Sequence, residues 1–363
     1  MLVLGMMSGT SLDGVDAAVL DTDGEAIFGF GRTGYRPYAA EEAEVLHAAL
    51  GRWPGAPGVA EAAALSVRAH AELATDFPEA EAIGYHGQTL AHDPGAGRTH
   101  QAGQGWQLAR ATNRRVVWDF RTEDVRQGGE GAPLAPFFHH ALAHWAVGQG
   151  RLEAAPVVFL NLGGVGNLTW CDPREADPLT ACVAFDTGPA NAPLNDLMRA
   201  RRGFPRDEGG VLAAQGEPRE SVIEKFLRYP YFARPAPKSL DRDAFAALGP
   251  AVAQMEDADA AATLTHAAAA AVAAGLGLLP SRPASVLACG GGRHNAAMME
   301  ALGARCGLPV RPVEEAGLDG DMIEAQAFAW LAARVLRGLP TSGPGTTGVP
   351  APVCGGRISP AFR

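Results

Sequence analysis

Acidic side chains stand beside glycine-rich turns at several points of the sequence. Asp13 and Asp16 follow the segment Gly9-Thr10-Ser11-Leu12, and Asp186 directly precedes Thr187. The backbone N–H groups and hydroxyls of such turns can bind a phosphate, and Mg²⁺ binds through one or two carboxylates plus phosphate oxygens. These residues favour a site for a metal-bound phosphate compound, although each turn taken singly also fits an ordinary tight turn.

Two further glycine turns have a comparable setting. Gly163-Gly164 follows the strand-like residues 157–160, and Gly290-Gly291-Gly292 follows residues 285–289. Open α/β sheets bind ligands at the carboxyl ends of their strands, so three turns at such ends support a phosphate site better than one. The sequence contains no G-x-x-x-x-G-K-[ST] segment, and its GGVGN turn lacks the spacing of a dinucleotide fingerprint. We therefore expect phosphate to be held in another way.

The first two turns belong to a pattern that occurs twice. Residues 2–4 and 15–20 flank the first turn, and residues 157–160 and 168–170 flank the second, so each half of the chain opens with a hairpin. Further strands are expected at 82–85, 115–118, 182–185 and 285–289, and helices at 61–73, 133–145, 193–201, 257–278, from 295 and at 324–337. Because strands alternate with helices, we expect an α/β fold with two lobes.

The lobes are expected to divide the chain unequally. We assign residues 1–131, with the first turn, to an N-terminal lobe and residues 132–363, with the other two turns, to a C-terminal lobe. A return of the last segment to the first lobe is left open.

The composition is globular, with an acidic surplus. Of 363 residues, 47% are hydrophobic and 19% are charged, and 40 acidic against 30 basic side chains give a net charge of −10. That charge disfavours general binding to nucleic acid or to an anionic membrane. The start lacks the features of a secretion signal, and the apolar run 267–280 is shorter than the ~20 residues that span a bilayer. We expect a cytoplasmic protein.

The cysteines and histidines favour no structural crosslink or zinc site. The five cysteines form no CxxC pair and are expected to stay reduced. His140 and His144 lie one helical turn apart, but no third ligand stands at a usual zinc spacing. The sequence does not decide the oligomeric state, and a homodimer is compatible with it.

Ordered blocks of the sequence resemble the anhydro-N-acetylmuramic acid kinase family. The segment from Gly9 to Asp16 resembles the first phosphate signature of that family. The other blocks are YHGQT at 85–89, DFR at 119–121, GGEGAPL at 128–134, NLGGVGNL at 161–168, FDTGPAN at 185–191, PAPKS at 235–239, CGGG at 289–292 and EAQAFAW at 324–330. Any one block would be weak evidence, but so many in the same order make chance improbable.

The resemblance implies a fold and a reaction. The fold is that of the actin-like and Hsp70-like ATPases, a ribonuclease H-like architecture of two lobes with duplicated mixed sheets, flanking helices and ATP in the cleft between the lobes. The reaction uses ATP and Mg²⁺ to hydrolyse the 1,6-anhydro bond of anhydro-N-acetylmuramic acid while the 6-oxygen receives the γ-phosphoryl group. The product is N-acetylmuramic acid 6-phosphate, an intermediate of peptidoglycan recycling.

The resemblance also implies roles for particular residues. Asp186 matches the family's catalytic aspartate and is assigned as the base that activates water, because a carboxylate can both orient water and favour developing positive charge in the sugar. Mg²⁺ is expected near Asp13 or Asp16. ATP is expected at Gly9, Thr10, Ser11, Leu12, Asp13, Gly14, Val15, Asp16, Gly163, Gly164, Gly290, Gly291 and Gly292. The sugar is expected at His86, Gln88, Asp119, Arg121, Glu130, Thr187 and Glu324.

Two cationic side chains are also candidates for the site, and two residues differ from those usual in the family. Arg121 is assigned to the lactyl carboxylate of the sugar because a guanidinium pairs bidentately with a carboxylate, and Lys238 is either a site cation or a member of a surface ion pair. Glu130 stands where the family usually has Gln, and Ala190 stands where it usually has Gly. Neither change removes a group that the chemistry needs.

Three other functions are alternatives to this one. A kinase of the same superfamily acting on another sugar or small acid is the nearest alternative. An ATP-driven chaperone or filament protein is disfavoured because too few residues follow Arg337 for a peptide-binding domain. A nucleotide sensor without catalysis would be favoured by loss of Asp186, which is present.

Overall fold

The computed structural model describes residues 1–9, 11–240 and 244–362, and the chain divides into two compact units. One unit comprises residues 1–145 and 322–363, and the other comprises residues 146–321. The boundary expected from the sequence lies after residue 131. In the structure, helix α5 (Pro136–Gly148) belongs largely to the first unit, where the ring of Phe138 lies 6.1 Å from that of Trp330.

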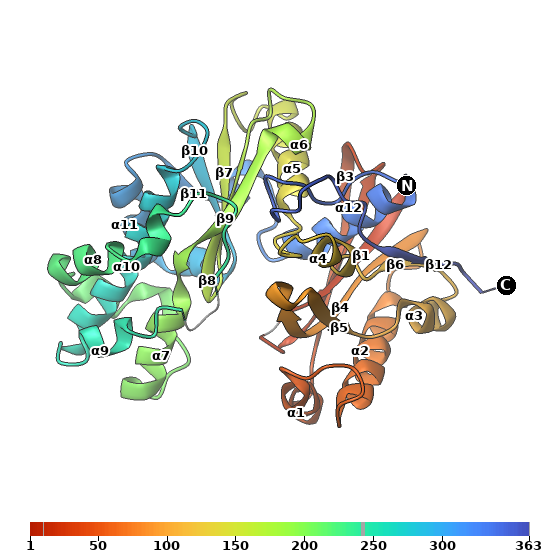
Figure 1. Cartoon of the computed structure of the whole chain (residues 1–363), viewed down its shortest axis with the longest axis horizontal. Helices are drawn as coiled ribbons and strands as arrows, with labels where there is room; N and C mark the ends of the chain where they lie inside the picture. The colour runs from red at the N-terminus through yellow and green to blue at the C-terminus, as the bar shows by residue number, and fades with distance from the viewer. Residues whose placement is uncertain (10, 241–243, 363) are drawn as a thin grey trace. The chain divides into compact units, whose positions relative to one another are not determined.

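The first unit is built on a seven-stranded mixed sheet (Figure 1). Its path runs in the order β12-β6-β4-β1-β2-β3, and β5 pairs with β4. Strand β1 is antiparallel to β2 and parallel to β4, while β2 is antiparallel to β3 and β4 is parallel to β6. The strands are β1 (Leu2–Ser8), β2 (Gly14–Thr22), β3 (Ile27–Pro37), β4 (Ala82–Asp93), β5 (Arg98–Ala102), β6 (Arg115–Trp118) and β12 (Arg357–Ser359).

Helix α12 (Ile323–Leu336) brings the end of the chain back onto this sheet. A side chain on Gly5 of β1 would collide with the backbone of Ala325, and one on Gly84 of β4 with the backbone of Phe328. Glycine therefore allows the helix to lie directly against both strands. Apart from Glu324, the residues from Ile323 to Val335 are buried, so α12 is a core helix.

The remaining helices of the first unit are short or peripheral. Leu65 and Leu73 of α2 pack into the same core as Ile83 and Tyr85 of the sheet. The helices are α1 (Ala40–Ala49), α2 (Val59–Ala74), η1 (Pro94–Ala96), α3 (Gly105–Thr112) and α4 (Thr122–Arg126).

The second unit repeats the strand order of the first. Its five strands run in the order β11-β10-β7-β8-β9, with β7 antiparallel to β8 and parallel to β10. Strand β7 thus corresponds to β1, and β10 corresponds to β4, which confirms the expected duplication of mixed sheets. The strands are β7 (Val157–Leu162), β8 (Val165–Cys171), β9 (Cys182–Pro189), β10 (Ser285–Cys289) and β11 (Val310–Pro312).

Helices α10 (Asp257–Leu276) and α11 (Ala296–Cys306) lie together on this second sheet (Figure 1). Small alanine side chains along α10 allow close packing on several sides, and residues such as Ala268, Ala269 and Val272 are buried. The other elements are α6 (Pro178–Ala181), α7 (Asn191–Arg202), η2 (Glu208–Gly210), η3 (Ala213–Gln215), α8 (Glu220–Leu227), η4 (Pro230–Ala233), α9 (Leu248–Val252), η5 (Gly291–His294) and η6 (Val313–Ala316).

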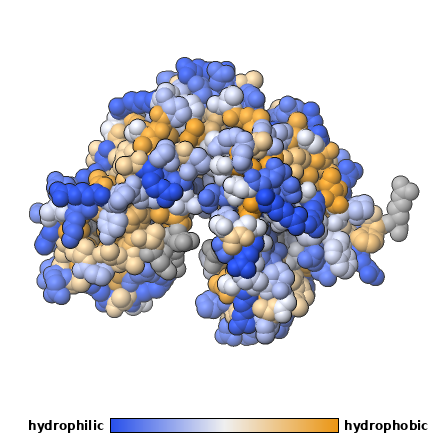
Figure 2. Space-filling view, viewed as in Figure 1, coloured by the Kyte–Doolittle hydropathy of each residue, from blue (hydrophilic) through white to orange (hydrophobic). Residues whose placement is uncertain are grey.

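The surface and the helix lengths agree with a globular protein. Figure 2 shows hydrophilic residues interspersed with hydrophobic ones over the visible face, and exposed apolar side chains such as Phe28 and Trp106 are common on protein surfaces. Within the described ranges, each helix is too short or too polar to cross a lipid bilayer.

Candidate active site

The first glycine turn is anchored at both ends by side chains of the first unit. The amide of Gln88 donates through Nε2 to the carbonyl oxygen of Gly9 (3.1 Å) and accepts a hydrogen bond from Ser8 Oγ (2.5 Å). At the other end, the carbonyl oxygen of Asp13 accepts from the Tyr35 hydroxyl (2.8 Å) and from the backbone N–H of Tyr38 (2.9 Å). The turn is therefore held in one shape by its carbonyl groups.

Within this turn, one residue has a strained backbone conformation, and one backbone N–H group has no hydrogen-bond partner among the described residues. Leu12 is buried with a φ of 58°, and its N–H donates to the carbonyl oxygen of Gly9 (3.3 Å). The N–H of Ser11 donates to no described residue. Gly14 and Val15 begin β2 and are buried, whereas Thr10 lies outside the described residues. The turn thus has its acceptors occupied and a donor available, which suits an anion.

Two carboxylates lie next to the turn. Asp13 is exposed and accepts a hydrogen bond from Ser11 Oγ (2.8 Å), and Asp16 on β2 is half-buried opposite Tyr35. Burial, followed by the charges of Asp13 and Asp16, raises the pKa of Tyr35, so both acids act on the same hydroxyl. The described residues contain no cluster of three metal-ligating side chains, but two carboxylates match the way Mg²⁺ binds beside phosphates.

The second turn, between β7 and β8, shows the same use of its backbone. The carbonyl of Gly163 accepts from the N–H of Asn191 (3.0 Å) and from its Nδ2 (2.9 Å), and the carbonyl of Gly164 accepts from the N–H of Ala190 (2.9 Å). The N–H groups of Gly163 and Gly164 donate to no described residue. The side chain of Ala190, the position where the family usually has Gly, is buried.

The third turn packs against the second. Gly290 has a φ of 72°, and a side chain there would collide with Asn161 at the end of β7. A side chain on Gly292 would come within 2.6 Å of the Cβ of Leu162, whereas Gly291 is exposed. These glycines therefore let two turns share one edge of the second sheet, as expected from the sequence.

A pocket of about 630 Å³ adjoins the third turn. Arg293, which directly follows Gly292, lines it together with His294, Pro312, Glu314, Leu318, Asp319 and Asp321. The guanidinium of Arg293 is buried and pairs with Glu314 (2.8 Å) and Asp321 (2.9 Å). The pocket is large enough for part of a small organic ligand.

Asp186 stands on β9, on the edge of the second sheet next to β8. Its backbone N–H donates to the carbonyl of Lys238 (3.0 Å), and its carboxylate oxygen Oδ2 accepts from the N–H of Leu240 (2.8 Å). Its carbonyl accepts from the Tyr231 hydroxyl (2.5 Å). The carboxylate is therefore fixed in direction while its side chain remains partly accessible.

Arg121 and His86 are hydrogen-bonded to each other in the first unit. Arg121 donates through Nε (3.2 Å) and Nη2 (3.1 Å) to His86 Nε2 and through Nη1 to the carbonyl of Gly131 (2.8 Å). Burial lowers the pKa of Arg121 to about 10, and burial together with the Arg121 charge lowers the pKa of His86 well below its ordinary range. No carboxylate lies within ion-pair distance of Arg121 among the described residues.

The other expected sugar residues differ in accessibility. Glu324 is exposed at the start of α12, yet surrounding protein atoms raise its pKa against the opposing effect of Arg121. Asp119 has a φ of 58°, pairs with Arg357 (2.9 Å) and accepts from Thr122 Oγ1. Glu130 is half-buried, and its N–H donates to Thr347 (2.7 Å). Of these three, Glu324 presents its carboxylate most openly.

Three of the expected residues have their polar atoms engaged inside the protein. Gln88 is fully buried and its amide is bonded to Ser8 and Gly9, so it holds the first turn. Thr187 is also buried, and its hydroxyl donates to the carbonyl of Gly166 (3.0 Å). Lys238 is 5% exposed and makes no ion pair within the described residues, so it is not part of a surface ion pair.

Asp124 is a buried carboxylate near Arg121 that the sequence does not indicate as a site residue. Its buried carboxylate accepts hydrogen bonds from the N–H of Gly131 (2.7 Å) and from the hydroxyls of Thr347 (2.6 Å) and Ser342. Gly131 is thus held from one side by Asp124 and from the other by Arg121. No local signal marks Asp124, because two of its three partners, Ser342 and Thr347, lie more than 200 residues further along the chain.

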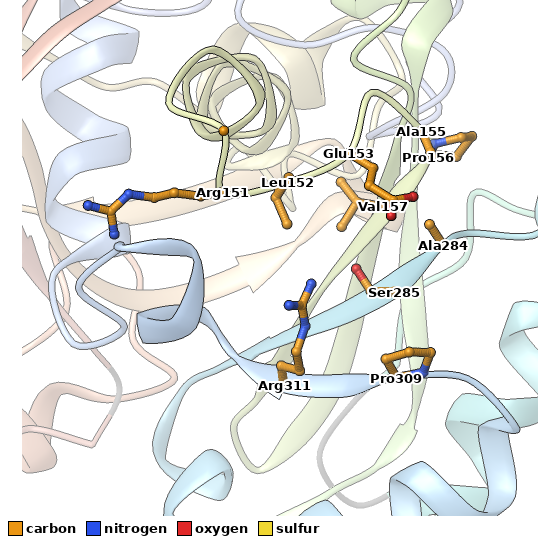
Figure 3. A pocket seen from close by; sticks show the side chains of 11 residues that line it. Arg151, Leu152, Glu153, Ala155, Pro156, Val157, Ala284, Ser285, Pro309 and Arg311 are labelled. Atoms are coloured by element: carbon orange, nitrogen blue, oxygen red, sulfur yellow. The ribbon is translucent and has the colours of Figure 1, made fainter.

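One pocket of about 430 Å³ lies away from the glycine turns. Figure 3 shows it at the amino ends of β7, β10 and β11, lined by residues such as Val157, Ser285 and Pro309. The glycine turns follow the carboxyl ends of β7 and β10. The guanidinium groups of Arg151 and Arg311 do not point toward one another in this pocket. It is therefore not part of the candidate active site.

The fold defines the class of this protein. The two units repeat one order of five strands, in which the second strand is antiparallel to the first and the other three are parallel to it. This is the ribonuclease H-like arrangement of the actin-like ATPase superfamily. A family model described as anhydro-N-acetylmuramic acid kinase matches residues 1–361. The chain belongs to the anhydro-N-acetylmuramic acid kinase family.

Two relatives agree with this membership in sequence. An anhydro-N-acetylmuramic acid kinase of Cereibacter sphaeroides is 64% identical over 358 residues, which cover 98% of this chain and 95% of the relative. One from Ruegeria sp. is 57% identical over 358 residues, covering 98% and 94%. Xylulose kinase from Rhodospirillum rubrum is similar in structure, with a TM-score of 0.46 and 14% identity, over 100% of this chain and 94% of that one.

Proposed function

We propose that this chain is an ATP-dependent kinase that hydrolyses the 1,6-anhydro bond of anhydro-N-acetylmuramic acid and phosphorylates O6. The products are N-acetylmuramic acid 6-phosphate and ADP, and the reaction belongs to peptidoglycan recycling. The observation that carries this assignment is the similarity over the whole chain, 64% to a relative of that name. The geometry of the turns, of Asp186 and of Arg121 supports it.

The glycine turns bind the phosphates of ATP. In the first and second turns the carbonyl groups are bonded within the protein, which leaves N–H groups of Ser11, Gly163 and Gly164 for phosphate oxygens. Such fixed donors stabilise the charge that develops during phosphoryl transfer. The third turn and its adjoining pocket receive the adenosine, because Gly290, Gly291 and Gly292 keep side chains out of its path.

Asp13 and Asp16 are the residues that would hold Mg²⁺. The ion, when bound, neutralises phosphate charge and orients the γ-phosphoryl group. Asp13 is exposed and Asp16 is half-buried, so their carboxylates remain within reach of a hydrated ion. Ser11 Oγ donates to Asp13 and keeps that carboxylate next to the turn.

Asp186 acts as the base in the ring-opening step. It removes a proton from water, the water oxygen forms a bond to the anomeric carbon, and the bond from that carbon to O6 breaks. The electron pair left on O6 forms the bond to the γ-phosphorus, and the bond from that phosphorus to ADP breaks. One proton therefore passes to Asp186 and one phosphoryl group passes to O6.

Arg121 binds the lactyl carboxylate of the sugar. Its guanidinium is half-buried and donates to a neutral imidazole and a carbonyl, neither of which balances its charge. An anionic substrate group supplies the missing charge, and guanidinium and carboxylate match in geometry. Glu324, Asp119 and Glu130 contact sugar hydroxyl or amide groups near it.

We also infer a cytoplasmic protein without a nucleic-acid or membrane partner, for which the net charge of −10 is the support. A homodimer remains compatible with the sequence.

A coupled assay of ADP formation tests the proposed function. With ATP and Mg²⁺, the rate should depend on anhydro-N-acetylmuramic acid and should not rise with N-acetylmuramic acid or glucosamine, which lack the anhydro bond. Equal turnover with a sugar that has a free 6-hydroxyl would make the chain an ordinary sugar kinase. ADP formation independent of any sugar would make it an ATPase.

A further inference from the structure

One short segment of the second unit holds Asp186 at three points. We call residues 231–240 the tether. Its Tyr231 donates through the hydroxyl to the carbonyl of Asp186 (2.5 Å), the carbonyl of Lys238 accepts from the N–H of Asp186 (3.0 Å), and the N–H of Leu240 donates to Oδ2 (2.8 Å). Both backbone groups and the carboxylate of one residue are thus restrained by a single segment.

Lys238 fixes Tyr231 in turn. Its Nζ donates to the carbonyl of Tyr231 (2.9 Å) and lies 4.4 Å from the centroid of the Tyr231 ring and 5.3 Å from that of Phe185. The side chain is 5% exposed, and burial, with a smaller effect of Arg234, lowers the pKa of Lys238 to about 8. A buried ammonium group without an ionic partner costs free energy, so packing alone does not account for a lysine here.

Packing does account for the rings of the tether. Tyr231 and Phe232 lie in an aromatic cluster with Phe226 and Phe245, at centroid distances of 4.7 to 5.9 Å. The bonds to Asp186 use the polar atoms of the tether and not these rings. The hydroxyl of Tyr231 can therefore be removed while the ring and its packing stay.

We propose that Tyr231 and Lys238 are positioning residues that hold the Asp186 carboxylate in the direction needed to take a proton from water. This inference rests on the proposed function, in which Asp186 is the base. A base must lie within hydrogen-bond reach of the proton that it abstracts, and a displacement of about 1 Å can cost about a hundredfold in rate. The tether fixes the main chain from which the carboxylate extends and also one of its oxygens.

Kinetics of Tyr231→Phe test the proposal. The variant should lose about tenfold in kcat, the factor expected for one hydrogen bond, while the KM values for ATP and the anhydro sugar change less than twofold. Lys238→Met should show the same pattern, and the double variant should lose no more than the worse single one, because both act through one segment. Tyr229→Phe is the matched control, since the Tyr229 hydroxyl makes no hydrogen bond to a described residue and the residue as a whole is 42% exposed.

Hydrogen exchange without substrate gives a readout that does not depend on activity. Tyr231→Phe should speed exchange in peptides that contain Asp186, and Tyr229→Phe should not. Unchanged exchange and unchanged kcat in Tyr231→Phe would overturn the proposal, as would equal losses in kcat and in affinity for both substrates. If the wild-type protein shows no sugar-dependent turnover, the proposed function fails and this role fails with it; an active wild type with an unaffected Tyr231→Phe rejects this role alone.

Discussion

Arg121 donates two hydrogen bonds to Nε2 of His86, and this relationship fixes the protonation of the imidazole. Because Nε2 accepts from Arg121, the proton of the neutral ring is on Nδ1, which lies 2.8 Å from the carbonyl of Gly87 and donates to it. The low pKa of His86 agrees with a neutral ring. His86 therefore orients the guanidinium without neutralising it, and the cation keeps its attraction for an anion.

The first prediction concerns this cation. Arg121→Lys keeps the positive charge but cannot form the bidentate hydrogen bonds that a guanidinium makes to a carboxylate. The KM for the anhydro sugar should therefore rise about tenfold or more, while the KM for ATP stays unchanged. Steady-state kinetics measure both constants. Arg126→Lys, on the exposed side of α4, is the control and should match the wild type. An unchanged sugar KM in Arg121→Lys would remove Arg121 from the carboxylate site.

The second prediction concerns the metal ligands. Asp13→Asn should weaken ATP binding more than about tenfold in calorimetry with Mg²⁺, because a neutral amide is a poorer ligand for a hard cation. In the presence of a chelator the variant and the wild type should bind ATP alike. Asp76→Asn, an exposed acid away from the turn, is the control. Equal Mg·ATP affinity of Asp13→Asn and wild type contradicts the metal role.

The third prediction concerns acid stability. Burial lowers the pKa of His70 to about 4, while the ordinary value of histidine is 6.5. At pH values between 4 and 6.5, the unfolded chain therefore binds a proton at His70 that the folded chain does not. The contribution of His70 to the free energy of unfolding is therefore fully present above pH 6.5 and is lost as the pH drops toward 4. The steepest contribution of one such group is about 1.4 kcal/mol per pH unit.

Denaturant titrations at several pH values measure this slope. His70→Leu should be less pH-dependent than the wild type between pH 4 and 6.5, even if it is less stable at pH 7. The exposed His47→Leu should retain the wild-type slope. If His70→Leu and the wild type lose stability in parallel, the low pKa of His70 is excluded.

Much of the fold could be predicted from the sequence because its signals are local. Apolar runs that end in glycine turns identified both hairpins, and strands β6 and β10 begin and end where the sequence placed them. Edge strand β3 and helix α1 were missed. The mixed polar sequence of β3 is half exposed along its length, so it shows no buried periodicity.

The candidate site was less predictable where side chains act on the backbone. The sequence identified Gln88 and Thr187 by their position in family blocks, but only the structure shows that their polar atoms hold Gly9 and Gly166. The roles of Asp124 and Tyr231 depend on partners far along the chain. Residue type and spacing do not reveal such contacts.

The fourth prediction concerns the base. Asp186→Asn keeps the shape of the side chain and can still meet the N–H of Leu240 through its oxygen, but it cannot take a proton. Turnover should fall by about a hundredfold to ten-thousandfold or more, while both substrates still bind. Asp177→Asn is the control, because asparagine also caps the helix that Asp177 begins. Retention of more than about a tenth of the wild-type turnover would contradict the assignment.

The central claim is that water opens the sugar ring and O6 accepts the phosphoryl group. Reaction in ¹⁸O-water, with mass spectrometry of the products, tests this most directly. One ¹⁸O atom should enter the sugar at the anomeric hydroxyl, and none should enter the phosphoryl group. Label in the phosphoryl group would mean that water attacks phosphorus, and the chain would then be an ATPase and not a ring-opening kinase.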